Sequence, residues 1–202
     1  MLEPLPSRQI RGLARTFYRR GWMEGTAGNL SIRQGDTLYI TASGRPKGTL
    51  SREDILTIPL NGAPPVSSGG RTPSAETSIH QAIYRLAPDT AAVLHIHTIE
   101  SALVSERLGP DLPLPPLEVL KGLGIPDPCV PTSIPIFEND LTVSDIAKKI
   151  TSRLSGPPSP VPVLLIRHHG TTAWGKSLEE AVRHLELAEY CFRFILGRER
   201  LP

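Results

Sequence analysis

Two histidines, His95 and His97, lie two residues apart at the end of the apolar, partly β-branched run A-A-V-L-H-I-H. Such a run, preceded by the turn-forming pair Pro88-Asp89, is typical of a β-strand. Side chains on a strand alternate between its two faces, so both imidazoles are expected to point the same way and to lie a few ångströms apart. Two imidazoles on one face make up half of a transition-metal site.

A third histidine, His169, follows another apolar run in the segment L-L-I-R-H-H-G. It precedes a glycine just past the expected strand, where side chains commonly face a functional site. Three protein ligands and one open position are the arrangement of catalytic zinc, so His169 is the candidate for the third ligand. On the residues alone, a surface turn is the alternative. His168 is expected to be a supporting or structural residue, because adjacent side chains cannot both point at one ion.

Glu76 and His80 lie four residues apart on an expected helix and therefore on one face of it. They could supply a further metal ligand and its orienting partner, or a general base. The alternative is an exposed pair on the helix surface that contributes only about 0.3 kcal/mol, and the spacing by itself favours this alternative.

Three turns combine backbone N–H groups at a glycine or a helix start with a short hydroxyl or amide donor, which is what a phosphate group needs. Their residues are Gly28, Asn29, Ser43, Gly44 and Ser74. Each is also compatible with an ordinary turn or helix cap. Arg45 and Lys47 either add positive charge there or are solvated loop residues. The turns match neither the phosphate-loop nor the dinucleotide glycine pattern, so nucleotide binding is not expected.

Glu118 stands among apolar residues in the segment P-P-L-E-V-L-K-G-L-G. A carboxylate in apolar surroundings can have a raised pKa and then serve as a general acid or base. Pairing with Lys121, one turn later, is the alternative.

Composition indicates a soluble globular protein, since 39% of the 202 residues are hydrophobic and 21% are charged. A net charge of +2 gives no electrostatic footprint for nucleic acid. No run approaches the roughly 18 apolar residues of a membrane span, and the first residues lack the apolar core of a signal peptide. The two cysteines, Cys129 and Cys191, form no motif. We therefore expect one cytoplasmic domain over residues 1–202, with no nucleic-acid or membrane partner.

The spacing of apolar residues predicts both helices and short strands. Helices are expected over 6–20, from Thr72 to 86, from 98, over 141–154 and over 177–196, where the capping box S-L-E-E opens the last helix and Gly197 ends it. Strands are expected over 30–32, 37–41, 55–60, 91–96, 130–137, 161–166 and 171–174. The Pro/Gly/Ser segment 61–71 is expected to be the least ordered, and 155–160 to be a stiff surface loop. These elements predict an α/β fold, with one central, mostly antiparallel sheet layered with helices.

Five motifs together resemble the class II aldolase/adducin family, in its order and over nearly the whole chain. They are T-A-G-N-L-S, I-T-A-S-G, P-S-A-E-T-S-I-H, A-A-V-L-H-I-H and R-H-H-G-T-T-A-W-G. The resemblance implies a divalent metal held by His95, His97 and His169, and a small phosphorylated sugar or ketose as substrate. It also implies that the residues of the three turns bind the substrate phosphate, and that the protein is a homo-oligomer, typically a tetramer. Zinc, one ion per subunit, is expected because three neutral imidazoles suit it; iron, manganese and cobalt are the alternatives.

Within that family, the Glu118 segment, the segment I-P-I-F-E-N-D and the turn His-Gly-x-x-x-Trp-Gly resemble the members that dehydrate a 1-phosphorylated 2-ketose. This resemblance assigns the catalytic acid/base to Glu118. Glu76 stands where aldolases of the family keep a carboxylate that binds metal and moves protons, so it is the second catalytic candidate. The alternatives are an aldolase, an epimerase, or a non-catalytic adducin-like interaction protein. The presence of all three histidines and both glutamates argues against the last.

Overall fold

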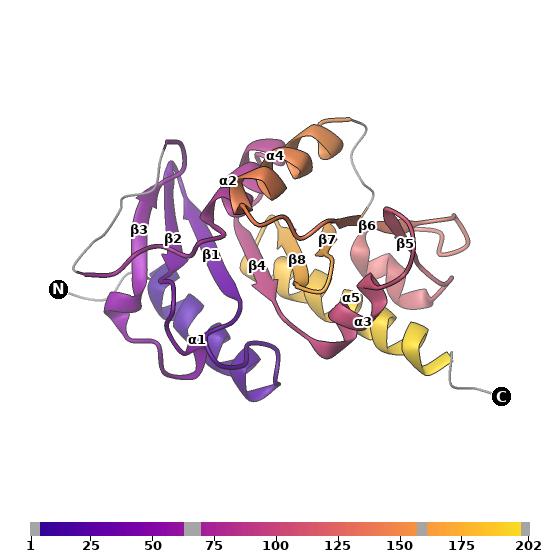
Figure 1. Ribbon diagram of the computed structural model, residues 1–202, viewed down its shortest axis with the longest axis horizontal. Helices are drawn as coiled ribbons and strands as arrows, with labels where there is room; N and C mark the ends of the chain where they lie inside the picture. Colours follow the sequence, from indigo (N-terminus) through magenta and orange to yellow (C-terminus); the bar gives the residue numbers. More distant parts are fainter. Residues whose placement is uncertain (1–4, 63–69, 157–160, 199–202) are drawn as a thin grey trace.

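A computed structural model describes residues 5–62, 70–156 and 161–198 (Figure 1). Within these residues a single eight-stranded sheet has the strand order β3-β2-β1-β4-β8-β7-β6-β5, and every neighbouring pair is antiparallel except β6 and β7. The strands are β1 (Asn29–Gln34), β2 (Thr37–Thr41), β3 (Ile55–Pro59), β4 (Ala92–Ile96), β5 (Asp111–Pro113), β6 (Ser133–Phe137), β7 (Val163–Ile166) and β8 (Gly170–Gly175). The predicted α/β architecture with a mostly antiparallel sheet is confirmed.

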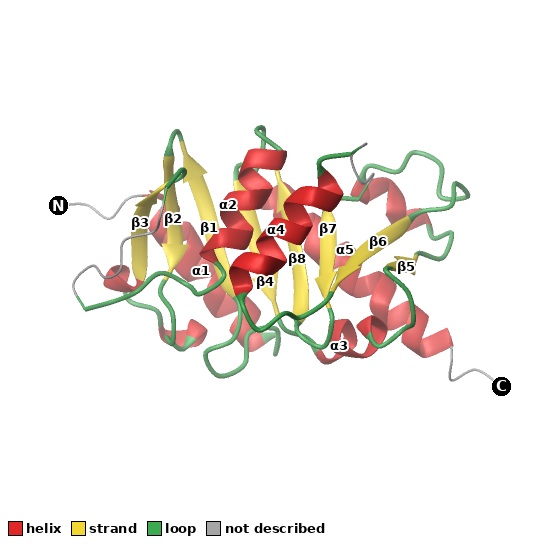
Figure 2. Cartoon of the chain, turned by 45° about the horizontal axis from the view of Figure 1, so that its top comes forward, coloured by secondary structure: helices red, strands yellow, loops and turns green. Residues whose placement is uncertain are grey.

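Helices cover both faces of this sheet. They are α1 (Leu5–Arg19), α2 (Thr77–Leu86), α3 (Ile99–Ser105), α4 (Val143–Leu154) and α5 (Leu178–Arg198), with short 3-10 helices η1 (Lys47–Thr49), η2 (Arg52–Asp54) and η3 (Glu118–Leu123). Figure 2 shows α2 and α4 lying across one face, with α1 and α5 behind the other. Two hydrophobic cores result, one on each side of the sheet.

The apolar stripes identified in the sequence face these cores. Ile10, Ala14 and Phe17 of α1 are fully buried against the first core, while Ile79 and Ile83 of α2 are buried in the second. Burying a side chain of this size contributes about 1.5–3 kcal/mol each, so the amphipathic pattern is sufficient to attach each helix to its own face.

Strand β4 occupies the middle of the sheet, between β1 and β8, and its register determines which residues surround His95. Asn29 of β1 pairs with His95 from one side, and Thr172 of β8 pairs with it from the other. Val93 belongs to the core beneath α2 and α4, so His95, two residues further along, faces the same side. The sheet thus presents His95 toward the beginning of α2.

Several predicted element boundaries are wrong. Helix α2 begins at Thr77 rather than at Thr72, because Pro73 forms a bridge with Ala42 that keeps this stretch extended. Helix α5 continues through Gly197 to Arg198, since Gly197 does not adopt the left-handed conformation that ends a helix. Strand β5 was not predicted. Residues 63–69 and 157–160, which fall within the two expected loops, lie outside the described residues.

Among the described helices, none is long and apolar enough to cross a membrane.

Candidate metal centre and phosphate pocket

His95 and His97 point the same way, as their spacing predicts. The Nε2 atoms of the two imidazoles are 2.9 Å apart, and the rings meet edge to face with centroids separated by 4.8 Å. His95 is almost fully buried, whereas His97 lies just past the end of β4 and is partly exposed. The pair therefore lies at the edge of the sheet and is accessible from one side.

The turn between β7 and β8 brings His169 to this pair. His168 has a φ of 52°, a left-handed conformation that is uncommon for a residue other than glycine and that reverses the chain direction. At Gly170 a side chain would collide with the carbonyl oxygen of Ile96, so only glycine allows the turn to approach β4 so closely. As a result, the His169 ring centroid lies 5.0 Å from that of His95 and 4.6 Å from that of His97.

Glu76, the N-cap residue of α2, completes the cluster. Its Oε1 lies 2.8 Å from Nε2 of His169, and its Oε2 lies 3.1 Å from Nε2 of His95. One ligand atom from each of the four residues lies within 4.8 Å of every other. The structure thus brings together the three predicted histidines and one of the two predicted glutamates, and these four residues are called the Glu76–histidine cluster below.

Hydrogen bonds on the outer side of two rings determine which nitrogen atoms face the centre. The Nδ1 of His95 lies 2.8 Å from Oγ1 of Thr172, and the Nδ1 of His169 lies 3.2 Å from Oδ1 of Asn139. The amide oxygen can only accept, so this contact favours the tautomer of His169 with its proton on Nδ1 and directs Nε2 toward the centre of the cluster. The Thr172 hydroxyl can accept a hydrogen bond from Nδ1 of His95, so His95 can also have its proton on Nδ1 and direct Nε2 toward the centre. Partners of this kind commonly orient metal-binding histidines.

The protonation states fit a cation in the centre. Burial lowers the pKa of His95 to about 4 and that of His97 to about 3, so both rings are neutral at pH 7. Burial raises the pKa of the Glu76 carboxyl, but His95, His169 and Asn29 more than offset this and hold it below its usual range. Neutral imidazoles and an ionised carboxylate therefore converge at short distances, a set of donors that suits a divalent cation. The donor set can hold a divalent metal ion.

A pocket beside the cluster collects the residues predicted to bind phosphate. Its lining includes Glu76 and His97, and it also contains all five predicted phosphate-binding residues, Gly28, Asn29, Ser43, Gly44 and Ser74. Gly28 has a φ of 73°, and a Cβ there would come within 2.8 Å of the carbonyl oxygen of His95. The glycine is therefore required for the first turn to reach the end of β4. This cavity is called the glycine-turn pocket below.

Lys47 also lines the glycine-turn pocket, although the sequence favoured a solvated loop position at least as strongly. Its side chain is buried, and its Nζ donates to the carbonyl oxygens of Thr26 (2.7 Å) and Arg45 (2.9 Å). Burial lowers the pKa of the ammonium group to about 8, against the opposing effect of Glu76, so the group is still mainly charged at pH 7. Arg45 instead pairs with Asp54.

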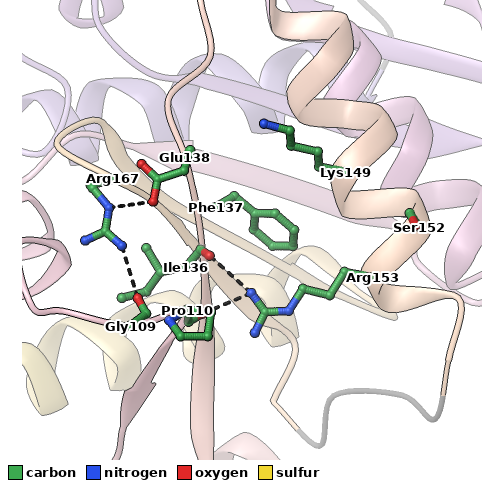
Figure 3. A pocket seen from close by; sticks show the side chains of 9 residues that line it. All are labelled: Gly109, Pro110, Ile136, Phe137, Glu138, Lys149, Ser152, Arg153 and Arg167. Atoms are coloured by element: carbon green, nitrogen blue, oxygen red, sulfur yellow. Dashed lines mark hydrogen bonds and ion pairs between the residues drawn. The ribbon is translucent and has the colours of Figure 1, made fainter.

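A second, larger pocket lies along α4 and β6 and contains three cationic side chains (Figure 3). Each cation already has an anionic partner: Arg153 pairs with Asp111, Arg167 with Glu138, and Lys149 with Asp140. The pocket includes none of the four residues of the Glu76–histidine cluster. The glycine-turn pocket, which adjoins that cluster, is therefore the better candidate for a phosphorylated substrate.

Glu118 does not join the cluster. It begins η3, its side chain is 77% exposed, and its Oε1 accepts a hydrogen bond of 2.6 Å from Nζ of Lys121. The local alternative considered from the sequence, a pair with Lys121, is thus what this single chain shows.

The prediction made from the spacing of Glu76 and His80, an exposed pair on the helix surface, is wrong. Both residues are buried, and His80 bonds to Asn29 and Ser31 instead. The orienting residues Thr172 and Asn139 were not identified either. Thr172 could have been suspected only from strand pairing, which the sequence does not specify, whereas Asn139 lies in a motif already noted for its resemblance.

The chain belongs to the class II aldolase and adducin family. The family model described as "Class II Aldolase and Adducin N-terminal domain" matches residues 8–196. This family is metal-dependent, in agreement with the donor set of the Glu76–histidine cluster.

Curated relatives give a narrower resemblance. The chain is 46% identical over 195 residues to the methylthioribulose-1-phosphate dehydratase of Microcystis aeruginosa, covering 95% of both chains. It is 42% identical over 192 residues to the enzyme of the same name from Leptospira biflexa, covering 90% of this chain and 92% of that one. Among solved structures, L-fuculose-1-phosphate aldolase from Thermus thermophilus superposes with a TM-score of 0.77 at 25% identity, covering 96% of this chain and 93% of that one.

Proposed function

We propose that this chain is a metal-dependent hydro-lyase that converts 5-methylthioribulose 1-phosphate to 2,3-diketo-5-methylthiopentyl 1-phosphate in methionine salvage. The observation that supports this most directly is the juxtaposition of the Glu76–histidine cluster with the glycine-turn pocket, in a chain 46% identical to a dehydratase of that name. A phosphate in the pocket would place the neighbouring carbons of a ketose at the cluster.

Zinc is the metal we propose, held by His95, His97 and His169, with Glu76 as an added ligand or as a group that orients one. When bound, the metal supplies Lewis acidity toward the carbonyl and hydroxyl oxygens of the substrate.

The residues of the chain would then bind the phosphate and transfer the proton. Backbone N–H groups and short side chains of the glycine-turn pocket, with the Lys47 ammonium, bind the phosphate and fix the position of C1. Glu118 takes the proton from C3, the C4 hydroxyl group leaves as water, and the resulting enol tautomerises to the 2,3-diketone. The overall change is the loss of one water molecule, so no oxidant or reductant is needed.

The exposure of Glu118 in the single chain bears on where the reaction takes place. As an acid/base it has to lie within hydrogen-bond reach of C3, whereas here its nearest partner is Lys121. The homotetramer implied by the family resemblance would allow Glu118 to meet the cluster of another copy. We propose this assembly, in the cytoplasm, with residues 1–202 as one domain.

Product analysis tests the proposed function. The zinc-loaded protein is incubated with 5-methylthioribulose 1-phosphate, and the products are separated and weighed by mass spectrometry. A dehydratase gives one product that is lighter by one water. An aldolase would instead break the C3–C4 bond to give dihydroxyacetone phosphate and methylthioacetaldehyde, an epimerase would give an isomer of unchanged mass, and an interaction protein would give no product.

A further inference from the structure

A buried line of polar side chains runs from the interior of the sheet to the Glu76–histidine cluster. Tyr84 OH lies 2.9 Å from Oγ of Ser31, which lies 2.7 Å from Nδ1 of His80. On the other side of the His80 ring, Nε2 lies 2.6 Å from Oδ1 of Asn29, whose Nδ2 donates to Oε2 of Glu76 at 2.7 Å. Each of these residues is at most 9% exposed, so water does not substitute for a missing partner.

The carboxylate at one end of this line sets the direction of the hydrogen bonds from Glu76 to His80. An ionised carboxylate only accepts, so the amide of Asn29 must present its nitrogen to Glu76 and its oxygen to His80. The amide oxygen also only accepts, so Nε2 of His80 must carry the proton. The ring is fully buried, and its other nitrogen, Nδ1, lies 2.7 Å from the Ser31 hydroxyl, which can donate to it. With the proton on Nε2, Nδ1 of the neutral ring accepts this hydrogen bond.

We propose that His80 is a positioning residue for the reaction proposed above: its Nε2–H holds the Asn29 amide in the one orientation that donates both to Glu76 and into the glycine-turn pocket. The Asn29 amide nitrogen has two protons, and Glu76 takes one of them. Because Asn29 lines the pocket, the second is assigned to a phosphate oxygen of the substrate.

The reverse orientation of the amide would be unfavourable at both ends. It would place the amide oxygen against the Glu76 carboxylate and against the bound phosphate, two acceptors that repel it. A neutral side chain at position 80 that lacks a donor removes one of the two contacts that hold the amide in this orientation and leaves the amide oxygen without its buried partner. A hydrogen bond of this kind contributes about 0.5–1.5 kcal/mol, which corresponds to about 2–12-fold in an equilibrium constant.

The variants that test this role differ in whether the side chain at position 80 can donate a hydrogen bond to Asn29. In His80→Gln the side-chain nitrogen replaces Nε2–H and the amide oxygen replaces the accepting Nδ1, whereas His80→Met offers no donor. We expect His80→Met to weaken competitive inhibition by inorganic phosphate and to raise KM for the phosphorylated ketose about tenfold, with a smaller change in kcat. His80→Gln should stay within about threefold of the unaltered protein in both.

Tyr84→Phe is the matched control, since it removes a hydroxyl from the same buried line but leaves the Ser31, His80 and Asn29 contacts in place. It should bind phosphate like the unaltered protein. If His80→Met binds inorganic phosphate as tightly as Tyr84→Phe does, the positioning role is refuted.

Nitrogen-15 NMR of histidine-labelled, metal-loaded protein gives a readout independent of activity and of the folding of His80→Met. His80 is assigned from the signal that disappears in His80→Gln. A neutral ring with the proton on Nε2 at pH 7 supports the proposal, and a proton on Nδ1, or on both nitrogens, overturns it. Because this proposal rests on the proposed function, the two failures must be separable: no dehydration by the unaltered protein rejects the function, whereas normal dehydration with the wrong His80 tautomer rejects only the positioning role.

Discussion

Glu76 and Glu118 are both candidates for proton transfer, yet the fold buries one of them and leaves the other exposed to solvent. The Glu76 side chain is 11% exposed and touches His95, His169 and Asn29. The Glu118 side chain is 77% exposed, and its carboxylate accepts a hydrogen bond from Lys121.

The difference shows how the environment divides two chemically similar groups. Glu76 is kept ionised by its neighbours in spite of burial, which suits a metal ligand or a hydrogen-bond acceptor and does not suit a group that must hold a proton. Glu118 lies where neither burial nor a fixed partner in the cluster restricts it. One chain therefore builds the metal and phosphate half of the proposed site, and the acid/base half depends on bringing Glu118 to it.

Loss of the metal is the largest effect expected, and it tests the pre-formed half. Each single replacement of His95, His97 or His169 with alanine should abolish metal binding and turnover. A catalytic zinc site typically has three protein ligands, so the loss of one leaves too few to hold the ion. His168→Ala is the control, since that side chain is exposed and lies outside the cluster. Metal content after dialysis is the measurement. A His169→Ala protein that binds zinc like the unaltered one would remove His169 from the ligand set.

The comparison itself is tested by two isosteric variants. Glu118→Gln should reduce kcat by about 10²–10⁴-fold with metal still bound, because a positioned acid/base typically contributes this much. Exchange of the substrate C3 proton with deuterated solvent should fall in parallel. Glu76→Gln should act mainly through weaker metal binding. If Glu76→Gln abolishes turnover with metal bound while Glu118→Gln remains active, the proton chemistry follows the aldolase arrangement instead.

Asn29 joins the metal cluster to the pocket, so its replacement should affect substrate choice. In Asn29→Leu the donor to Glu76 and to the phosphate is lost, and Oε2 of Glu76 loses a buried partner. The loss at Glu76 is the same for both ketoses, whereas a hydrogen bond to a charged phosphate contributes about 1.5–3 kcal/mol, so the preference for the phosphorylated ketose should fall at least about tenfold. The ratio of kcat/KM for the two ketoses is the measurement. A ratio equal to that of the unaltered protein would exclude Asn29 from phosphate recognition.

The last prediction concerns stability behind the cluster rather than turnover. Glu189 of α5 accepts hydrogen bonds from Oγ1 of Thr98 (3.1 Å) and of Thr171 (3.2 Å), residues that follow His97 and Gly170. Burial raises the pKa of this carboxyl from 4.5 to about 7, so the folded protein holds a proton that the unfolded chain releases. The resulting stability is fully present below pH 4.5 and is lost as the pH rises through 7.

Glu189→Gln should remove this dependence. Relative to the variant, the unaltered protein should lose about 3 kcal/mol of unfolding free energy between pH 4.5 and pH 8. Urea unfolding of both metal-loaded proteins across this range gives the difference, in which the shared histidines cancel. Parallel curves for the two proteins would show that Glu189 does not hold the proton.

Local patterns in the sequence determined the features that depend on neighbouring residues. The period of two placed His95 and His97 on one face, and the apolar stripes of α1 and α2 predicted buried helices, because strand alternation and helical repeat are properties of the backbone itself. The α/β class and the mostly antiparallel sheet followed from the same patterns. The element ends were less predictable, since the bridge between Ala42 and Pro73 displaced the start of α2.

Only the tertiary structure decided which distant residues meet. The spacing favoured an exposed position for His80, and Lys47 was left open between a solvated loop residue and a charge at the phosphate site. Both are buried, because strands and turns from elsewhere in the chain cover them. Whether Glu76 or Glu118 joins the histidines was undecided for the same reason. A carboxylate's proton affinity depends on its desolvation and on charges within a few ångströms, and both are set by the pairing of β1, β4 and β8 rather than by the residues beside it in the sequence.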